Sequence, residues 1–158
     1  SPNRPKSRGF VEIKSNNYLD DPKIQFNYLE HEEDLQQMRD SIKIANKIFN
    51  QESMKKYLGD QLRPGYDATD NELDDIIRNT ADTAYHPSCT NKMGTDSMSV
   101  VDEETKVYGV ENLRVIDSSI MPDILSGNLN AGTIMIAEKA ADMILKREEA
   151  PIDADYYS

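Results

Sequence analysis

The chain has few of the residues that usually build a metal site or a disulfide framework. Its 158 residues include one cysteine, two histidines and no tryptophan. A single cysteine cannot form an internal disulfide and is typical of a reducing compartment. The thiol and the two imidazoles also lie too far apart in sequence for a zinc site of the usual Cys/His type. We therefore expect no bound metal.

Long apolar runs and phosphate-binding glycine motifs are missing as well. No stretch approaches the roughly 20 apolar residues that span a bilayer, and we recognise no signal peptide in the basic, proline-containing opening. Neither G-x-G-x-x-G nor the Walker pattern occurs. If the chain works with a dinucleotide, the phosphate-binding half must therefore lie elsewhere.

Acidic side chains outnumber basic ones. Twenty-nine Asp and Glu residues against eighteen Lys and Arg residues give a net charge of -11. This balance argues against nonspecific binding to nucleic acid or to an anionic membrane. We expect no nucleic-acid partner, no transmembrane segment and a cytoplasmic location, with peripheral membrane attachment of a longer parent left open.

Turn signals and hydrophobic spacing predict an α+β fold. Alternating apolar and polar residues predict short strands at Phe10–Lys14 and Lys23–Leu29. Apolar side chains at helical spacing predict helices at about 32–49, within 51–58 and at about 131–146. A capping-box spacing of Thr69 and Glu72 predicts a helix from Asp70 to Thr80. Further short strands are expected at 100–101, 105–107 and 113–116.

His86 is the first candidate for chemistry, in the segment Ala84-Tyr-His-Pro-Ser-Cys-Thr-Asn-Lys-Met-Gly94. An imidazole can accept and return a proton near neutral pH without much tuning. Pro87 fixes one backbone angle of the loop and so restricts how the ring is aimed. The alternative is a structural or merely exposed histidine. His31, which lies among acidic residues, is interpreted as a surface histidine.

Asn128 and Asn130 open the predicted last helix. One interpretation is N-capping, because an asparagine oxygen can accept hydrogen bonds from free helix amides. The other is that one carboxamide binds a substrate hydroxyl while the second faces a cofactor. Asparagine cannot take a proton at neutral pH, so it would assist a base rather than replace it.

Asp117 and Cys89 each have two interpretations. Asp117 ends an apolar segment before Ser118, where it could cap the following turn or approach a ribityl or phosphate group. The two alternatives are evenly matched. Cys89 is interpreted as a packed thiol, because only His86 and Lys92 lie near enough in sequence to lower its pKa.

The order of these motifs resembles the C-terminal signature of the glucose-methanol-choline (GMC) flavin oxidoreductases. The similarity extends from Lys6-Ser-Arg-Gly9 to Asp142-Met-Ile144 and is dense over residues 84–145. Tyr-His-Pro-Ser-Cys-Thr followed by Lys-Met-Gly is most similar to the choline dehydrogenases of that family. The resemblance implies later parts of the substrate domain in residues 1–98, a return to the FAD domain in 99–147 and an acidic tail in 148–158.

The resemblance also implies roles for individual residues. His86 matches the catalytic base, and Asn128, ten positions before Glu138, matches the second active-site residue, which is His or Asn in the family. Asn130 and Ala131 match the stretch near the flavin ring. Asp117 and Ser118 match a stretch near the sugar-phosphate part of FAD.

The implied function is oxidation of choline to betaine aldehyde by an FAD-dependent enzyme of which this chain is the C-terminal segment. His86 would abstract the hydroxyl proton and a hydride would pass to the flavin. FAD would be held mainly by the missing N-terminal half, so the partners are the rest of the polypeptide, a small alcohol and an electron acceptor. The alternatives are a non-catalytic folding or interaction module and a GMC enzyme for another primary alcohol.

Overall fold

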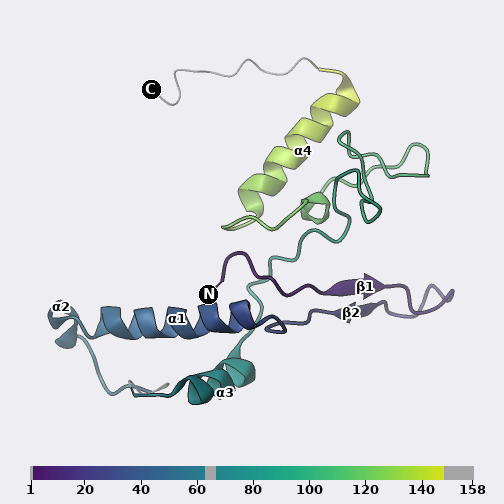
Figure 1. Cartoon of the computed structure of the whole chain (residues 1–158). Helices are drawn as coiled ribbons and strands as arrows, with labels where there is room; N and C mark the ends of the chain where they lie inside the picture. The colour runs from purple at the N-terminus through teal and green to yellow at the C-terminus, as the bar shows by residue number, and fades with distance from the viewer. Residues whose placement is uncertain (1, 63–66, 148–158) are drawn as a thin grey trace. The chain divides into compact units, whose positions relative to one another are not determined.

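The computed structural model describes residues 2–62 and 67–147, coloured along the chain in Figure 1. The contacts within it form two compact units, residues 1–84 and 85–158. The predicted boundary between 98 and 99 concerns the domains of a longer protein and stays a prediction. The acidic tail predicted at 148–158 lies outside the described residues.

The first unit contains a two-stranded antiparallel ribbon (Figure 1). Strand β1 (Phe10–Glu12) pairs with β2 (Lys23–Gln25), and Val11 lies opposite Ile24. Both predicted strands are confirmed, but each is shorter than predicted. All residues of the ribbon strands are exposed. Together with the helices, this small sheet confirms the α+β class.

Helices α1 (Glu32–Phe49) and α3 (Asp70–Thr80) form the core of the first unit. Leu35 of α1 is buried against Leu73 and Ile77 of α3, and partly buried apolar side chains surround them: Leu29, Met38, Ile42 and Ala68. The predicted bounds of both helices are confirmed. The short helix predicted within 51–58 is present as α2 (Glu52–Lys55).

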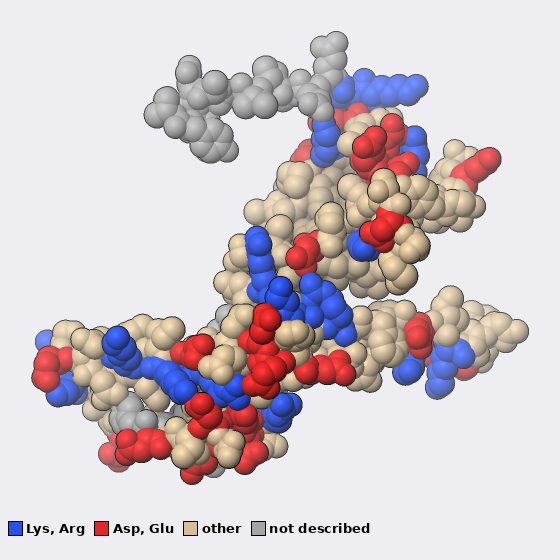
Figure 2. Space-filling model, viewed as in Figure 1, with Lys and Arg blue, Asp and Glu red and all other residues tan. Residues whose placement is uncertain are grey.

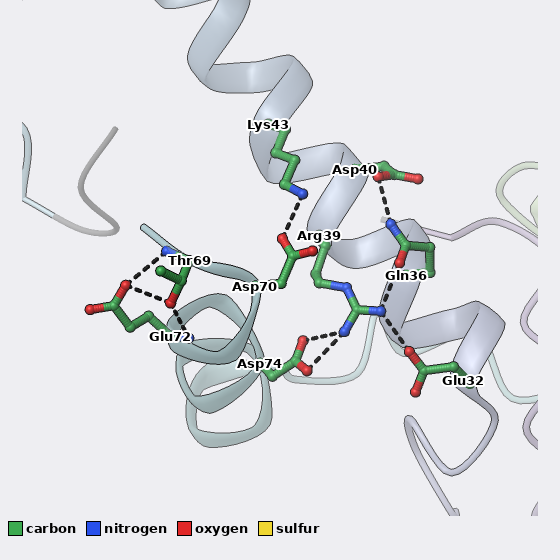
Figure 3. A network of polar contacts seen from close by, with 9 residues as sticks. All are labelled: Glu32, Gln36, Arg39, Asp40, Lys43, Thr69, Asp70, Glu72 and Asp74. Atoms are coloured by element: carbon green, nitrogen blue, oxygen red, sulfur yellow. Dashed lines mark hydrogen bonds and ion pairs between the residues drawn. The ribbon is translucent and has the colours of Figure 1, made fainter. Parts of the chain in front are cut away.

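The start of each long helix is capped by a side chain. Thr69 and Glu72 form the predicted capping box of α3, in which each side chain bonds the backbone of the other (Figure 3). His31, predicted to be a surface residue, is exposed but also caps α1, because its Nδ1 accepts a hydrogen bond from the Glu33 amide at 3.2 Å. A cap satisfies a helix amide that would otherwise have no partner.

Arg39 joins α1 to α3 through its guanidinium group (Figure 3). Its Nη1 lies 2.7 and 2.8 Å from the two carboxylate oxygens of Asp74, and its Nη2 donates to Glu32 and Gln36. Hydrogen bonds to Glu32 and Asp74 raise the pKa of Arg39 above its ordinary value. Figure 2 shows acidic and basic side chains interleaved over this pair of helices. The α1–α3 contact is therefore polar along one edge and apolar inside.

The second unit is built around α4 (Asn130–Leu145) and the short 3-10 helix η1 (Ser118–Ile120). Its buried apolar side chains include Val101, Ile120, Met121, Leu129 and Ala140. The predicted last helix is confirmed within one residue at each end. Within residues 2–62 and 67–147, no helix combines the length and apolar content needed to cross a bilayer.

The three short strands predicted after residue 99 are wrong. The segments make only isolated bridges, which join Met93 with Val101, Val101 with Val107, and Lys106 with Arg114. Backbone turns interrupt them, because residues between or beside the bridges have left-handed φ angles: Thr105 (66°), Gly109 (75°) and Asn112 (57°). A residue in that region cannot continue an extended strand, so the pairings do not lengthen into a sheet.

Candidate active site

His86 lies on a loop whose backbone is constrained on both sides. Tyr85 before it has φ 59° and Cys89 after it has φ 68°, both in the left-handed region that favours glycine. Such conformations cost of order 1–3 kcal/mol and persist only where the surrounding structure holds them. His86 is half-buried. The loop that carries His86, the one imidazole of this unit, thus has two residues in a strained backbone conformation.

Backbone hydrogen bonds fasten the loop to η1. The amides of residues 89, 91 and 93 donate in turn to the carbonyls of residues 118, 119 and 120, with N···O distances of 3.3, 2.9 and 2.8 Å. The Asn91 side-chain amide also donates to the Ser119 hydroxyl at 3.0 Å. Because every second amide takes part, the segment after His86 is tied to η1 along its whole length.

Asn128 reaches His86 across 42 residues of sequence. Its amide nitrogen, Nδ2, lies 3.0 Å from Nε2 of His86. An amide nitrogen can only donate, so Nε2 accepts, and the proton of the neutral ring is on Nδ1. The two strongest candidates from the sequence are therefore brought together, with the basic nitrogen of His86 facing the carboxamide.

Neither asparagine caps α4. The N-cap is Leu129, which makes no side-chain cap hydrogen bond, and Asn130 is already the first helical residue. The N-capping interpretation is therefore wrong for Asn128 and Asn130. The carboxamide of Asn128 bonds the imidazole instead, and the roles predicted for Asn128 and Asn130 toward substrate and cofactor stay predictions.

Asp117 does cap the turn that follows it. Its carboxylate accepts a hydrogen bond from the Ser119 amide at 2.7 Å, at the start of η1. This confirms the capping alternative, while approach of Asp117 to a cofactor stays a prediction. The hydroxyl of Ser118 lies 2.5 Å from that of Thr133 in α4. No signal in the sequence marks Thr133, because its partner lies 15 positions away and no motif joins them.

The first turn of α4 suits an electron-rich group. Since no side chain caps it, its amide hydrogens leave about half a positive charge at the helix start. Asn130 and Ala131 form this turn and are exposed. These groups fit the flavin that the resemblance implies, because a reduced flavin carries negative charge at one edge of its ring. Among the described residues, no group of three or more His, Cys, Asp or Glu could hold a metal ion.

A cavity of about 330 Å³ lies between α4 and the segment after η1. Its lining is mainly apolar and rich in methionine, with Met93, Met121, Met135 and Met143 among its residues. Gly132 lets that segment come close, because a Cβ there would lie 2.6 Å from a methyl group of Leu125. Neither His86 nor Asn128 is among the residues that line this cavity.

Comparison with known proteins places these features in a family. The chain is 52% identical over 153 residues to the oxygen-dependent choline dehydrogenase of Vibrio vulnificus. The matched residues cover 95% of this chain and 27% of that protein. Among solved structures, pyridoxine 4-oxidase from Mesorbium loti superposes with a TM-score of 0.85 at 30% identity, over 93% of this chain and 29% of that one.

An FAD-dependent oxidoreductase from Chaetomium thermophilum superposes with a TM-score of 0.83 at 36% identity, over 90% of this chain and 25% of that one. The chain thus spans between a quarter and a third of the length of these proteins. A family profile described as GMC oxidoreductase matches residues 5–137. This chain belongs to the GMC oxidoreductase family.

Proposed function

We propose that the chain is the C-terminal segment of an FAD-dependent enzyme that oxidises choline to betaine aldehyde. The observation that carries this proposal is the 3.0 Å contact between His86 Nε2 and the Asn128 amide. The contact pairs a group able to accept a proton near neutral pH with a donor able to hold the oxygen that loses it. The 52% identity to a choline dehydrogenase supports the choice of substrate.

The proposed role of His86 is that of general base. In the neutral tautomer that accepts the Asn128 amide, the ring proton is on Nδ1 and Nε2 carries the electron pair that can take a proton. An alcohol hydroxyl entering between the two side chains would donate its proton to Nε2 and accept a hydrogen bond from Asn128. One hydrogen bond of the free site is then exchanged for two with substrate. As the proton moves to His86, negative charge grows on the oxygen that Asn128 holds.

The uncapped start of α4 is the proposed contact with the cofactor. Asn130 and Ala131 would hold the electron-rich edge of the ring through the field of the helix end. The chemistry that FAD supplies when bound is acceptance of the hydride that leaves the alcohol carbon as the C=O bond forms. A separate electron acceptor completes the turnover. Binding of the cofactor by Asp117 and Ser118 is part of the same proposal.

The cofactor's phosphate site and most of the recognition of choline are assigned to the rest of the polypeptide. The full-length protein that contains this chain is called the parent enzyme. No glycine-rich phosphate motif occurs in this chain, and it has no tryptophan, although a trimethylammonium group favours aromatic faces. Exposed apolar side chains such as Ile13, Leu19 and Met135 fit surfaces that a larger protein covers. We therefore expect the isolated chain to purify colourless and inactive and the parent enzyme to be yellow.

Steady-state oxidation of choline by the parent enzyme, with an artificial electron acceptor, tests the proposal. His86→Ala should lower kcat/KM by about 10²- to 10⁴-fold, the usual size of an acid–base contribution, while bound flavin is retained. His31→Ala is the matched control, because it removes the chain's other imidazole from a helix cap in the first unit. A His86→Ala enzyme with bound flavin and normal turnover would overturn the catalytic assignment.

Two outcomes would favour the alternatives. Turnover of another primary alcohol with a much higher kcat/KM than choline would assign the chain to a different GMC enzyme. A parent protein that binds no flavin and oxidises no alcohol would favour a non-catalytic folding or interaction module, in which His86 and Asn128 only stabilise the loop.

A further inference from the structure

We infer that Ser118 and Thr133 form a hydroxyl pair that positions His86 against Asn128, a role that rests on the proposed function. Ser118 Oγ lies 2.5 Å from Thr133 Oγ1, and both residues are half-buried. Ser118 begins η1, to which the His86 loop is fastened, and Thr133 lies in the first turn of α4, just after Asn128. The pair therefore joins the two segments that carry the site.

The direction of the hydrogen bonds follows from donor counting. Thr133 Oγ1 also lies 2.8 Å from the carbonyl oxygen of Leu129. A carbonyl can only accept, so the single hydroxyl proton of Thr133 is directed to Leu129. Ser118 must then donate its own proton to Thr133 Oγ1. The result is a directed chain of two hydrogen bonds from Ser118 through Thr133 to Leu129.

The two hydrogen bonds end at Leu129, the residue next to Asn128. The Leu129 carbonyl accepts both the Thr133 hydroxyl and the Thr133 amide, each at 2.8 Å. Leu129 is buried, with 5% of its surface exposed, whereas Asn128 is exposed. Thr133 thus fixes the carbonyl of the residue that directly follows Asn128.

The two hydrogen bonds begin at Ser118, which contacts the His86 loop. The carbonyl of Ser118 accepts the amide of Cys89, three positions after His86. Ser118 therefore holds the loop through its backbone and α4 through its side chain. Loss of either hydroxyl would leave the loop and the helix end free to shift relative to each other.

Such a shift matters because the proposed base works only in a narrow geometry. A displacement of about 1 Å can cost a reaction on the order of 10²-fold. Ser118 and Thr133 make hydrogen bonds to other parts of the protein, so they are positioning residues rather than groups that handle the proton. The Ser118 hydroxyl therefore has a positioning role in addition to the cofactor contact proposed for that residue.

The test uses the parent enzyme with its flavin and choline as substrate. Thr133→Val keeps the shape of the side chain and removes its hydroxyl, Thr133→Ser restores the hydroxyl, and Ser118→Ala removes the other partner. Each variant is made alone and together with His86→Ala. Bound flavin and the melting temperature are measured for every variant.

We expect Thr133→Val and Ser118→Ala each to lower kcat/KM by roughly 10- to 100-fold, mainly through kcat. Thr133→Ser should recover most of the loss. In the His86→Ala enzyme, Thr133→Val should not lower the residual rate further, because the group that Thr133 positions is gone. The double variant of Ser118 and Thr133 should lose little more than the worse single variant.

Other results separate the failure of this inference from that of the proposed function. Normal turnover in the Thr133→Val and Ser118→Ala enzymes, with His86→Ala impaired, would overturn the positioning role alone. Normal turnover in His86→Ala would overturn the proposed function. An equal further loss from Thr133→Val in the His86→Ala background, or loss of flavin in both hydroxyl variants, would make the pair purely structural and contradict the inference.

Discussion

Asp34 offers a sharp test of how the first unit is held together. The side chain is buried, with 1% of its surface exposed. Its Oδ1 accepts the Lys6 amide at 2.7 Å, and its Oδ2 accepts the amide and the hydroxyl of Ser7 at 2.7 and 2.5 Å. One carboxylate thus fastens the start of the chain to α1. Asp34→Asn keeps the size of the side chain and removes the charge.

The expected cost follows from the donors that lose their acceptor. An asparagine retains one oxygen and presents an NH2 group in place of the other, so at least one backbone amide of Lys6 or Ser7 then faces a donor. A hydrogen bond to a charged group contributes about 1.5–3 kcal/mol. We therefore expect Asp34→Asn to weaken this contact by about 2 kcal/mol at pH 7, or roughly 30-fold in the local opening equilibrium.

The effect should depend on pH. Burial raises the pKa of Asp34, but hydrogen bonds from the Ser7 hydroxyl and the Lys6 and Ser7 amides outweigh it, and the nearby His31 acts with them. The pKa in the folded chain therefore lies below the ordinary value of 3.8. A lowered pKa contributes stability above the unfolded value, and this stability is lost as the pH falls through the folded value. The difference between wild type and Asp34→Asn should shrink below about pH 4.

Hydrogen exchange at the Lys6 and Ser7 amides, followed by NMR in the 158-residue chain and corrected for the intrinsic rate at each pH, measures this directly. Glu33→Gln is the matched control, because it removes one acidic charge from the same first turn of α1 without touching these amides. Protection in Asp34→Asn within threefold of wild type at pH 7, or a difference as large at pH 3 as at pH 7, would refute the reasoning.

Two further predictions concern the α1–α3 contact and the His86 loop. Arg39→Met should lower the urea midpoint of the chain more than Lys43→Met. Both side chains pair with a carboxylate of α3, but the Arg39 side chain is 9% exposed, whereas those of Lys43 and its partner Asp70 are 49% and 57% exposed. Equal midpoints would contradict this. Cys89→Gly should be about 1 kcal/mol more stable than Cys89→Ala, because only glycine adopts φ 68° without a steric penalty. Urea unfolding followed by circular dichroism measures the difference. A more stable Ala variant would show that the left-handed conformation does not limit stability at this position.

Local sequence signals predicted the helices well. The helical spacing in α1 and the capping box of Thr69 and Glu72 depend on residues within a few positions of each other, so their consequences are readable along the chain. The short strands predicted after residue 99 failed for the opposite reason. Two or three apolar residues can equally form a single bridge, and left-handed residues such as Asn112 stop the pairing from continuing.

The sequence also pointed to His86 and Asn128 as the residues of interest, but from a family pattern rather than from geometry. It left open whether the asparagines cap the helix, since capping and substrate binding use the same residue type at the same place. The structure resolves that choice against capping, because Leu129 occupies the cap position and the Asn128 carboxamide bonds the imidazole.

By itself the sequence determined what depends on near neighbours and on residue type: the α+β class, the long helices, the absence of a glycine-rich phosphate motif and the identity of the titratable side chain in the loop. Only the tertiary structure decided which distant groups meet, namely His86 with Asn128, Ser118 with Thr133, and Asp34 with Lys6 and Ser7. The physical reason is that each of these contacts closes a loop of 15 to 42 residues. Its geometry is set by all the packing in between, and no short spacing in the sequence records it.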